Sequence, residues 1–90
     1  MIGRQVFYEG RVHGVGFRYT TRTIAKGFDV IGWVKNLPDG RVEMQICGAP
    51  DEVRDFLDAV RDSELNSHIK MVHENAIPPL LDVKGFEIRY

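Results

Sequence analysis

Hydrophobic and polar residues follow one another along this chain in two different periods. Alternation over residues 5–12 predicts a half-buried strand whose inner face carries Val6, Tyr8 and Val12. Over residues 17–28, apolar and small side chains instead recur at the spacing of a helix, on one stripe, which predicts an amphipathic helix. The change of period places a loop between them, where a strand leads into the start of a helix.

The middle of the chain predicts a hairpin followed by a second helix. Residues 30–36 are rich in β-branched and aromatic side chains, and residues 41–47 alternate cleanly. Between them, Pro38-Asp39-Gly40 is typical of a tight turn. From Pro50 onward, apolar residues recur at i, i+3, i+4 and i+7, and a proline suits the first position of a helix.

The last third of the chain predicts a weaker strand at residues 69–74, a loop at residues 76–82 and a closing strand at residues 85–90. The order is β-α-β-β-α-β with a short extra strand. Right-handed crossovers leave few topologies for that order, and the favoured one is the ferredoxin-like, split β-α-β arrangement. We therefore expect an α+β sandwich. It would be a single domain over residues 1–90, with an antiparallel sheet of four to five strands and two helices on one face.

Composition and charge restrict the possible partners. Hydrophobic and charged fractions of 43% and 28% are ordinary for a globular protein. The net charge of −1 argues against a general nucleic-acid or membrane-surface binder, so any anion site must be local. Cys47 is the only cysteine, which fits a reducing compartment. No segment resembles a signal peptide or a membrane span, and we expect a cytoplasmic protein.

The candidate functional stretch is the loop of residues 13–18, His-Gly-Val-Gly-Phe-Arg. Gly14 and Gly16 lack the Cβ atoms that would keep backbone N–H groups from closing around a ligand. The start of a helix adds unpaired N–H donors and the positive end of the dipole, and both attract anions. A cation in the first helical turn, Arg18, is disfavoured unless an anion lies there, and its planar fork suits a phosphate.

On spacing alone, two interpretations of this loop stay open. It is either an anion site or a simple turn followed by a solvated arginine. It is not a dinucleotide-binding motif, because the third glycine is absent, and it lacks the Gly-Lys-Ser/Thr ending of a Walker loop.

Three ordered motifs are more specific than the loop by itself. They are GRVHGVGFR at residues 10–18, GWVKN at residues 32–36 and DGRVE at residues 39–43. Together they resemble the acylphosphatases, whose pattern is G-x-V-Q-G-V-G-F-R, then G-x-V-x-N, then D-G-x-V. The resemblance covers essentially the whole chain. One departure is His13, which stands where the family has glutamine; this leaves the role of its side chain open and its N–H available.

The resemblance implies hydrolysis of small acyl phosphates to a carboxylate and inorganic phosphate, with phosphate also acting as an inhibitor. By position, Arg18 matches the phosphate-binding arginine and Asn36 matches the asparagine that orients the attacking water. From its place before a turn alone, Asn36 would instead be assigned a backbone role. The matched phosphate cradle consists of the backbone amides of His13, Gly14, Val15, Gly16, Phe17 and Arg18. Neither the loop nor these positions offer metal ligands, so no metal and no cofactor are expected.

Two alternatives remain. Ferredoxin-like domains host many functions, so a non-catalytic module for RNA or a phosphorylated ligand is possible, although Glu9 and Glu43 suit RNA poorly. Acylphosphatase-like domains also occur at the front of large carbamoyltransferases used in hydrogenase maturation. Because this chain starts and ends at the domain, we expect a free-standing enzyme, and we take a monomer as the starting expectation. The sequence does not identify the physiological acyl group, and it contains no feature that fixes the oligomeric state.

Overall fold

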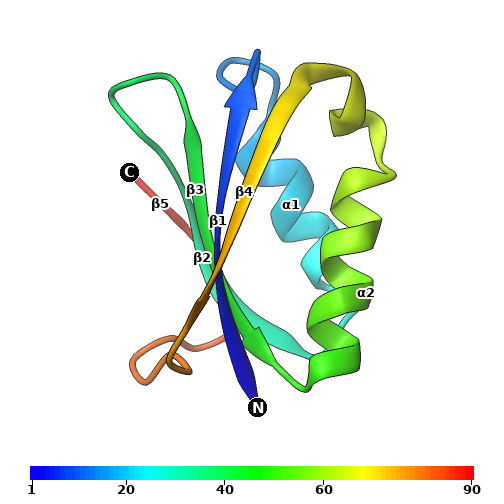
Figure 1. Cartoon of the computed structure of the whole chain (residues 1–90), viewed down its shortest axis with the longest axis vertical. Coiled ribbons are helices and arrows are strands. Elements are labelled where there is room, and N and C mark those ends of the chain that lie inside the picture. Colours follow the sequence, from blue (N-terminus) through cyan, green and yellow to red (C-terminus); the bar gives the residue numbers. More distant parts are fainter.

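The computed structural model describes all of residues 1–90, as five strands, two α-helices and one short 3₁₀-helix. One layer is a twisted sheet, and both α-helices cover the same face of it (Figure 1). The elements in chain order are β1 (Ile2–Gly10), α1 (Phe17–Ala25), β2 (Val30–Asn36), β3 (Val42–Gly48), α2 (Pro50–Arg61), the 3₁₀-helix η1 (Glu64–His68), β4 (Ile69–Ile77) and β5 (Phe86–Arg89). This confirms the expected ferredoxin-like α+β sandwich.

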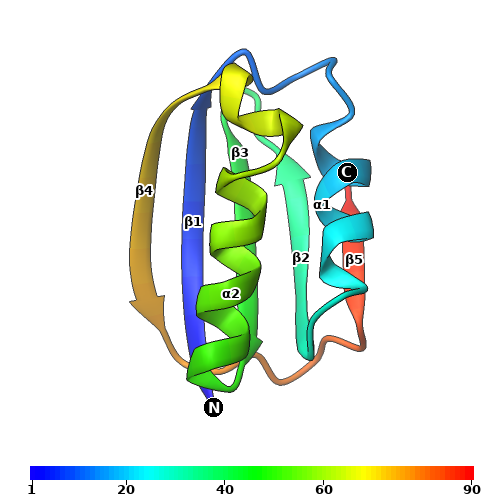
Figure 2. The same cartoon turned by 90° about the vertical axis from the view of Figure 1, so that its right-hand side faces the viewer.

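The strands of the sheet lie in the order β4-β1-β3-β2-β5. The pairs β1–β3, β1–β4 and β2–β3 are antiparallel, whereas β5 runs parallel to β2. The expectation of a wholly antiparallel sheet is therefore wrong for the last strand. After β4, residues 78–85 cross to the opposite edge along the end of the sheet where β2 begins (Figure 2). The chain thus enters β5 in the direction of β2.

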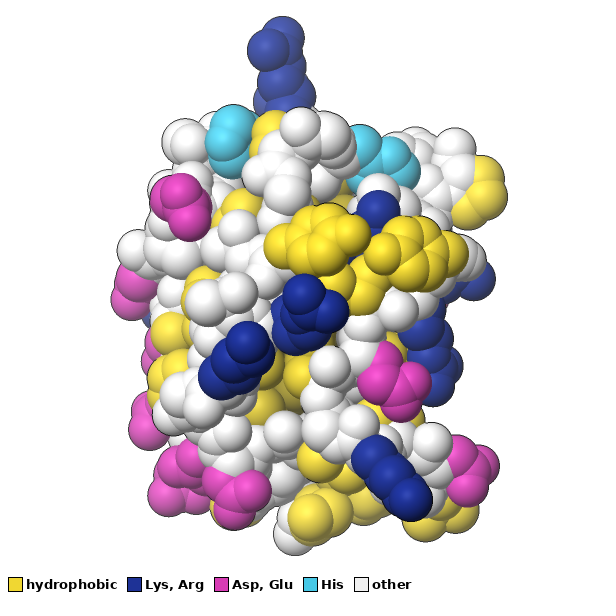
Figure 3. Space-filling model, turned by 180° about the vertical axis from the view of Figure 1, so that it is seen from behind, with side chains coloured by type: hydrophobic (Ala, Val, Ile, Leu, Met, Phe, Trp, Pro, Cys, Tyr) yellow, Lys and Arg dark blue, Asp and Glu magenta, His cyan; other side chains and the backbone are white.

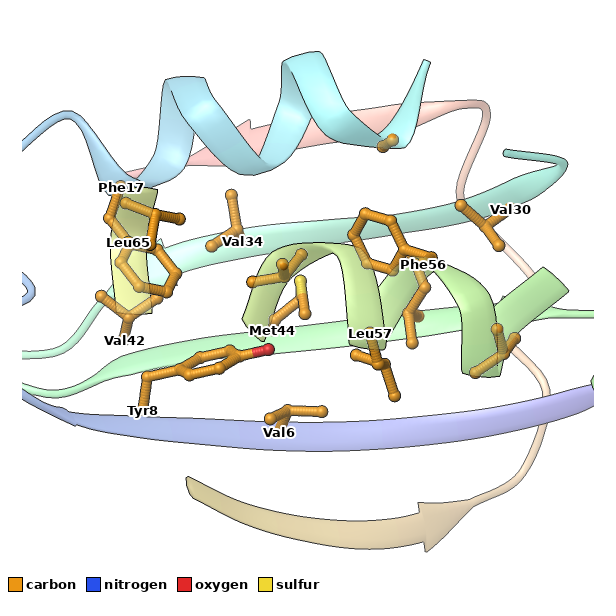
Figure 4. Close-up of a cluster of buried hydrophobic side chains, with 14 of the residues drawn as sticks. Val6, Tyr8, Phe17, Val30, Val34, Val42, Met44, Phe56, Leu57 and Leu65 are labelled. Carbon is orange, nitrogen blue, oxygen red and sulfur yellow. The ribbon is translucent and has the colours of Figure 1, made fainter. Parts of the chain in front are cut away.

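The hydrophobic core lies between the sheet and the two α-helices. Figure 4 shows Val6 and Tyr8 of β1 and Met44 of β3 gathered in one cluster with Phe56 and Leu57 of α2. In α2 the buried residues are those that the helical spacing selects: Val53, Phe56, Leu57 and Val60. Pro50 starts this helix and acidic residues follow it in the first turn, which suits the helix dipole.

Several strand ends differ from the expected ones: β1 begins at Ile2 rather than residue 5, and β3 and β5 are displaced by one residue at each end. β1 stops at Gly10 because the register with β4 shifts there, and the next N–H, of Arg11, donates instead to the carbonyl of His68 at 2.9 Å. The loop is consequently longer than the alternation suggests, although Val12 remains buried within it. β4 continues to Ile77, beyond the predicted residue 74, because it pairs along nearly the whole of β1. No helix is long and apolar enough to cross a membrane.

Candidate active site

The loop between β1 and α1 takes its shape from two glycines. Gly14 and Gly16 have φ angles of 75° and 72°, in the left-handed region that other residues rarely adopt. A Cβ atom at either position would meet nothing within 4 Å, so the need for glycine is conformational rather than one of space. Successive turns of this kind point N–H groups into a common concavity, which is the geometry of an anion-binding nest.

The N–H groups of this loop have no backbone partners. None of the 12 backbone hydrogen bonds outside the regular elements is donated by residues 13–19, and the first donor after them is Thr20, to Gly16 at 2.9 Å. No acidic side chain lies in the first turn of α1. The buried Thr21 hydroxyl donates to the carbonyls of Phe17 and Arg18, at 3.0 and 2.9 Å, and so holds this turn in place. Free donors and an uncompensated helix dipole together make a site for an anion.

The Arg18 side chain is held against the end of β5. Its Nη1 donates to the carbonyl of Arg89 at 3.3 Å, and its guanidinium carbon lies 4.6 Å from the centre of the Tyr90 ring. None of the ion pairs of the protein includes Arg18. The cation is therefore oriented by a carbonyl and a ring and keeps its full charge for a ligand.

The structure brings Arg18 and Asn36 to the same hollow. This hollow has a volume of about 270 Å³ and is lined by Val12, Gly14, Gly16, Phe17, Arg18, Tyr19 and Asn36. Four of the six residues expected to form the cradle line it. His13 and Val15 do not, and Val15 packs instead against the hydrophobic core.

Asn36 is the last residue of β2, and its side-chain carbonyl is unusual. The Oδ1 atom is buried and has no hydrogen-bond partner. A buried acceptor left unpaired costs about 1–3 kcal/mol, so it needs a reason to persist. The turn after β2 does not explain the unpaired carbonyl. Its hydrogen bonds join the backbones of Leu37, Gly40 and Arg41 and do not involve the Asn36 side chain. Asn36 itself lines the hollow, so an unpaired acceptor belongs to one of the residues that form it.

His13 points away from the hollow. Its Nε2 lies 2.9 Å from the carbonyl oxygen of Arg41, in the turn between β2 and β3. Because a carbonyl oxygen only accepts, Nε2 carries the hydrogen in this bond. The side chain thus joins the loop to the turn that follows Asn36. The sequence did not predict this contact, because it depends on two loops meeting at one end of the sheet.

Two tyrosines were missed by the sequence analysis. Tyr19 lines the hollow, and its hydroxyl lies 3.3 Å from the hydroxyl of Tyr90, the last residue of the chain. Both side chains are exposed. The only sequence signal is an aromatic residue on the polar side of the first helix, which by itself does not indicate a site. No three His, Cys, Asp or Glu side chains are grouped so that they could hold a metal ion.

Comparisons with known proteins agree with this geometry. A family model described as Acylphosphatase matches residues 4–88. An acylphosphatase of Archaeoglobus fulgidus is 38% identical over 89 residues, which cover 99% of this chain and 84% of that protein. One of Pediococcus pentosaceus is 43% identical over 83 residues, 90% of each chain.

Solved structures give the same result. The crystal structure of acylphosphatase from Bacillus subtilis matches over 100% of both chains, with a TM-score of 0.89 and 33% identity. The crystal structure of T. kodakarensis HypF matches all of this chain with a TM-score of 0.85 and 25% identity, but over 12% of its own length. The matches run through the loop, β2 and the turn after it, and do not favour a non-catalytic module. The chain accordingly belongs to the acylphosphatase family of hydrolases.

Proposed function

We propose that this acylphosphatase cleaves small acyl phosphates in the hollow between the 13–18 loop, α1 and the end of β2. In the proposed complex, Arg18 and the backbone amides of residues 13–18 hold the phosphoryl group, and Asn36 positions the attacking water. The observation that carries the proposal is that Asn36, whose Oδ1 is buried and unpaired, lines the same hollow as Arg18, a cation without a carboxylate partner.

The hydrogen-bond donors of the site suit the phosphoryl group of the substrate. Phosphoryl transfer depends mainly on positioning and on stabilising the charge of the equatorial oxygens. The loop offers N–H groups without backbone partners, and Arg18 offers a planar pair of donors. A preorganised donor of this kind typically contributes ~2.7–4 kcal/mol to the transition state.

The side-chain carbonyl of Asn36 is suited to hold the attacking water. The water donates one hydrogen to Oδ1, so that its oxygen can attack phosphorus from the side opposite the acyl oxygen. The new P–O bond forms as the bond to the acyl oxygen breaks, and the carboxylate leaves with the electron pair. No residue lining the hollow is a carboxylate, a histidine or a cysteine. The water proton therefore passes to an oxygen of the substrate phosphate, and the carboxylate needs no proton to leave.

We further propose that residues 1–90 act as one monomeric domain in the cytoplasm, without a metal ion and without nucleic acid. One core of 15 buried residues supports the single domain, and a net charge of −1 suits a small-molecule enzyme better than a nucleic-acid binder. The RNA-binding alternative has little support on the open sheet face. Guanidinium groups already cover its aromatic rings, with Arg41 4.7 Å from Phe7 and Arg89 4.8 Å from Trp33.

The test compares two phosphate compounds. Phosphate release is followed with acetyl phosphate and with phenyl phosphate, for the wild type and for Arg18→Ala. We expect the wild type to hydrolyse acetyl phosphate and not the phosphomonoester, because only a carboxylate leaves without protonation. Arg18→Ala should lose the activity. Wild-type protein that releases phosphate from neither compound would contradict the proposal.

A further inference from the structure

A second hollow lies at the edge of the sheet, between the C-terminal half of α1 and the start of β5. It has a volume of about 280 Å³, and its lining consists of two cations, Arg22 and Lys26, together with Gly85 and four apolar side chains. It shares no residue with the hollow that Arg18 and Asn36 line. A ligand held here would therefore bind outside the candidate active site.

The two cations of this hollow have no counter-ion. Neither Arg22 nor Lys26 takes part in an ion pair of the protein. They are four residues apart, so they lie on the same side of α1, one turn from each other. No carboxylate lines the hollow, and its only polar side chains are these two, which act solely as donors. The helix dipole favours cations at this end of α1, but it does not account for the apolar hollow that they border.

The absence of a carboxylate distinguishes this hollow from most others on the protein. Three of the five hollows contain at least one carboxylate: Glu64 in one, Asp58 and Glu74 in another, and Asp29 in a third. Only the candidate active site and the present hollow contain cations without a carboxylate. On the face opposite that of Figure 1, Lys and Arg side chains lie beside hydrophobic ones, and most acidic side chains lie at the margins (Figure 3). By its charge, the second hollow is therefore suited to an anion.

Aromatic rings form part of the apolar wall of the hollow. Phe28 and Phe86 both pack against the fully buried Phe56, with ring centroids 6.0 and 5.9 Å from it, and both remain half-buried. Gly85 leaves room beside them, because a Cβ atom there would meet nothing within 4 Å. Its N–H donates no backbone hydrogen bond, whereas its carbonyl accepts one from Gly32 at 2.9 Å. The hollow thus offers an aromatic surface, a backbone N–H and two cations.

We propose that this hollow is a second ligand site, which binds a small aromatic carboxylate. The ring of the ligand packs against Phe28 and Phe86, since aromatic pairs attract each other edge to face or offset. Its carboxylate accepts charged hydrogen bonds from Arg22 and Lys26. A cavity of about 150 Å³ can hold benzene, so about 280 Å³ leaves room for a ring with a short acidic arm. The proposal goes beyond hydrolysis and does not depend on it, because none of these residues lines the candidate active site.

A titration followed by heteronuclear NMR tests the site residue by residue. The probe is 3-phenylpropanoate, and the protein is used as wild type and as Arg18→Gln, which removes the cation of the candidate active site. We expect saturable shifts of the amide signals of Lys26, Phe28, Gly85 and Phe86, with the same Kd in both proteins. Two matched compounds should each bind about tenfold more weakly: 3-phenylpropanamide, which lacks the charge, and butanoate, which lacks the ring.

Substitutions of the two cations test the charge selectivity. Arg22→Gln and Lys26→Gln should each weaken the binding of 3-phenylpropanoate about fivefold, the upper value for an exposed charge pair, and leave the binding of 3-phenylpropanamide unchanged. The double variant should bind the two compounds equally. Lys70→Gln, which removes an exposed lysine from β4, is the control and should bind like the wild type. Since Arg22 and Lys26 are exposed, the variants should remain folded, which their amide spectra verify.

Two results would overturn the second site. One is a wild type that shows no saturable shifts at the amides beside this hollow, or that binds the uncharged amide as tightly as the carboxylate, because the cations then select no anion. The other is a set of shifts confined to the 13–18 loop and lost in Arg18→Gln, because the ligand would then occupy the candidate active site. A failure of the proposed function looks different: acetyl phosphate is not hydrolysed, while the shifts beside the second hollow are unchanged.

Discussion

The imidazole of His13 joins the two halves of the candidate site, because its Nε2–H donates to the carbonyl of Arg41 at 2.9 Å. His13 belongs to the loop that offers the N–H donors, and Arg41 closes the turn that follows Asn36. Leu37 donates to the same carbonyl from within that turn, at 2.8 Å. The contact therefore sets the position of the phosphate-binding loop relative to the residue proposed to hold water.

Replacing His13 tests this contact. A glutamine side chain carries an amide N–H that can donate to the Arg41 carbonyl, so His13→Gln should keep activity at neutral pH within a few-fold. His13→Ala removes the donor and should lower the free energy of unfolding by about 1 kcal/mol, with a larger loss of kcat/KM than in His13→Gln. Steady-state kinetics and chemical denaturation measure the two effects. A collapse of kcat in His13→Gln would instead make the imidazole a general base.

Replacing Arg18 tests the bidentate binding of phosphate. Arg18→Ala should lose phosphate affinity and about 10²–10³ in kcat, the usual effect of removing one preorganised donor. Arg18→Lys should recover little of either, because a point charge cannot reproduce the planar fork. Calorimetric titration with phosphate and steady-state kinetics provide the measurements, with Arg61→Lys on α2 as the control. Near-normal activity in Arg18→Lys would rule out the bidentate role.

Replacing Asn36 separates water positioning from phosphate binding. Asn36→Ala should lower kcat and kcat/KM by the same factor and leave phosphate affinity nearly unchanged, because the lost interaction forms only with the attacking water. Since Oδ1 is buried and unpaired, the variant should be no less stable than the wild type. The control is Asn75→Ala, an exposed asparagine on β4. Weaker phosphate binding with a normal kcat would reassign Asn36 to the phosphate cradle.

Inorganic phosphate should stabilise the protein as well as inhibit it. A ligand that binds only the folded state adds about 2.7 kcal/mol at a hundred times its Kd, so Tm should rise with phosphate concentration. Thermal unfolding in phosphate and in chloride at equal ionic strength measures the effect. A chelator should change neither Tm nor activity, because the proposed phosphate ligands are N–H and guanidinium donors. Activity lost to a chelator and restored by a divalent metal would contradict this.

Acid should loosen the turn that carries Arg41. Hydrogen bonds from the Arg41 backbone N–H and side chain hold the pKa of Asp39 below its ordinary value of 3.8. A depressed folded-state pKa adds stability above the unfolded value, and this stability is lost as pH falls through the folded one. Asp39→Asn should therefore show a smaller loss of stability than the wild type below about pH 4. Denaturation curves between neutral and acidic pH test this, and parallel pH profiles for the two proteins would disprove it.

The local part of the structure could be predicted from the sequence. Hydrophobic residues recur with a period of two along a strand and 3.6 along a helix, because one face of each element is covered. These periods were enough to predict the hairpin, both helices and the buried positions of α2. β2 begins and ends at the predicted residues, Val30 and Asn36. The motifs likewise identified Arg18 and Asn36, which line one hollow in the structure, although their proposed roles remain to be tested.

Contacts between distant segments were decided only by the tertiary structure. The parallel pairing of β5 with β2 depends on where the chain crosses after β4, and no local period records that path. His13 with Arg41 and Tyr19 with Tyr90 are joined for the same reason, since each pair comes from segments that meet at one end or one edge of the sheet. The hydrophobic periodicity of a helix or strand indicates whether a side chain is buried or exposed, but not which distant residue it contacts. The identity of its partner is set by packing, and so the contacts of His13 and Tyr19 could be recognised only in three dimensions.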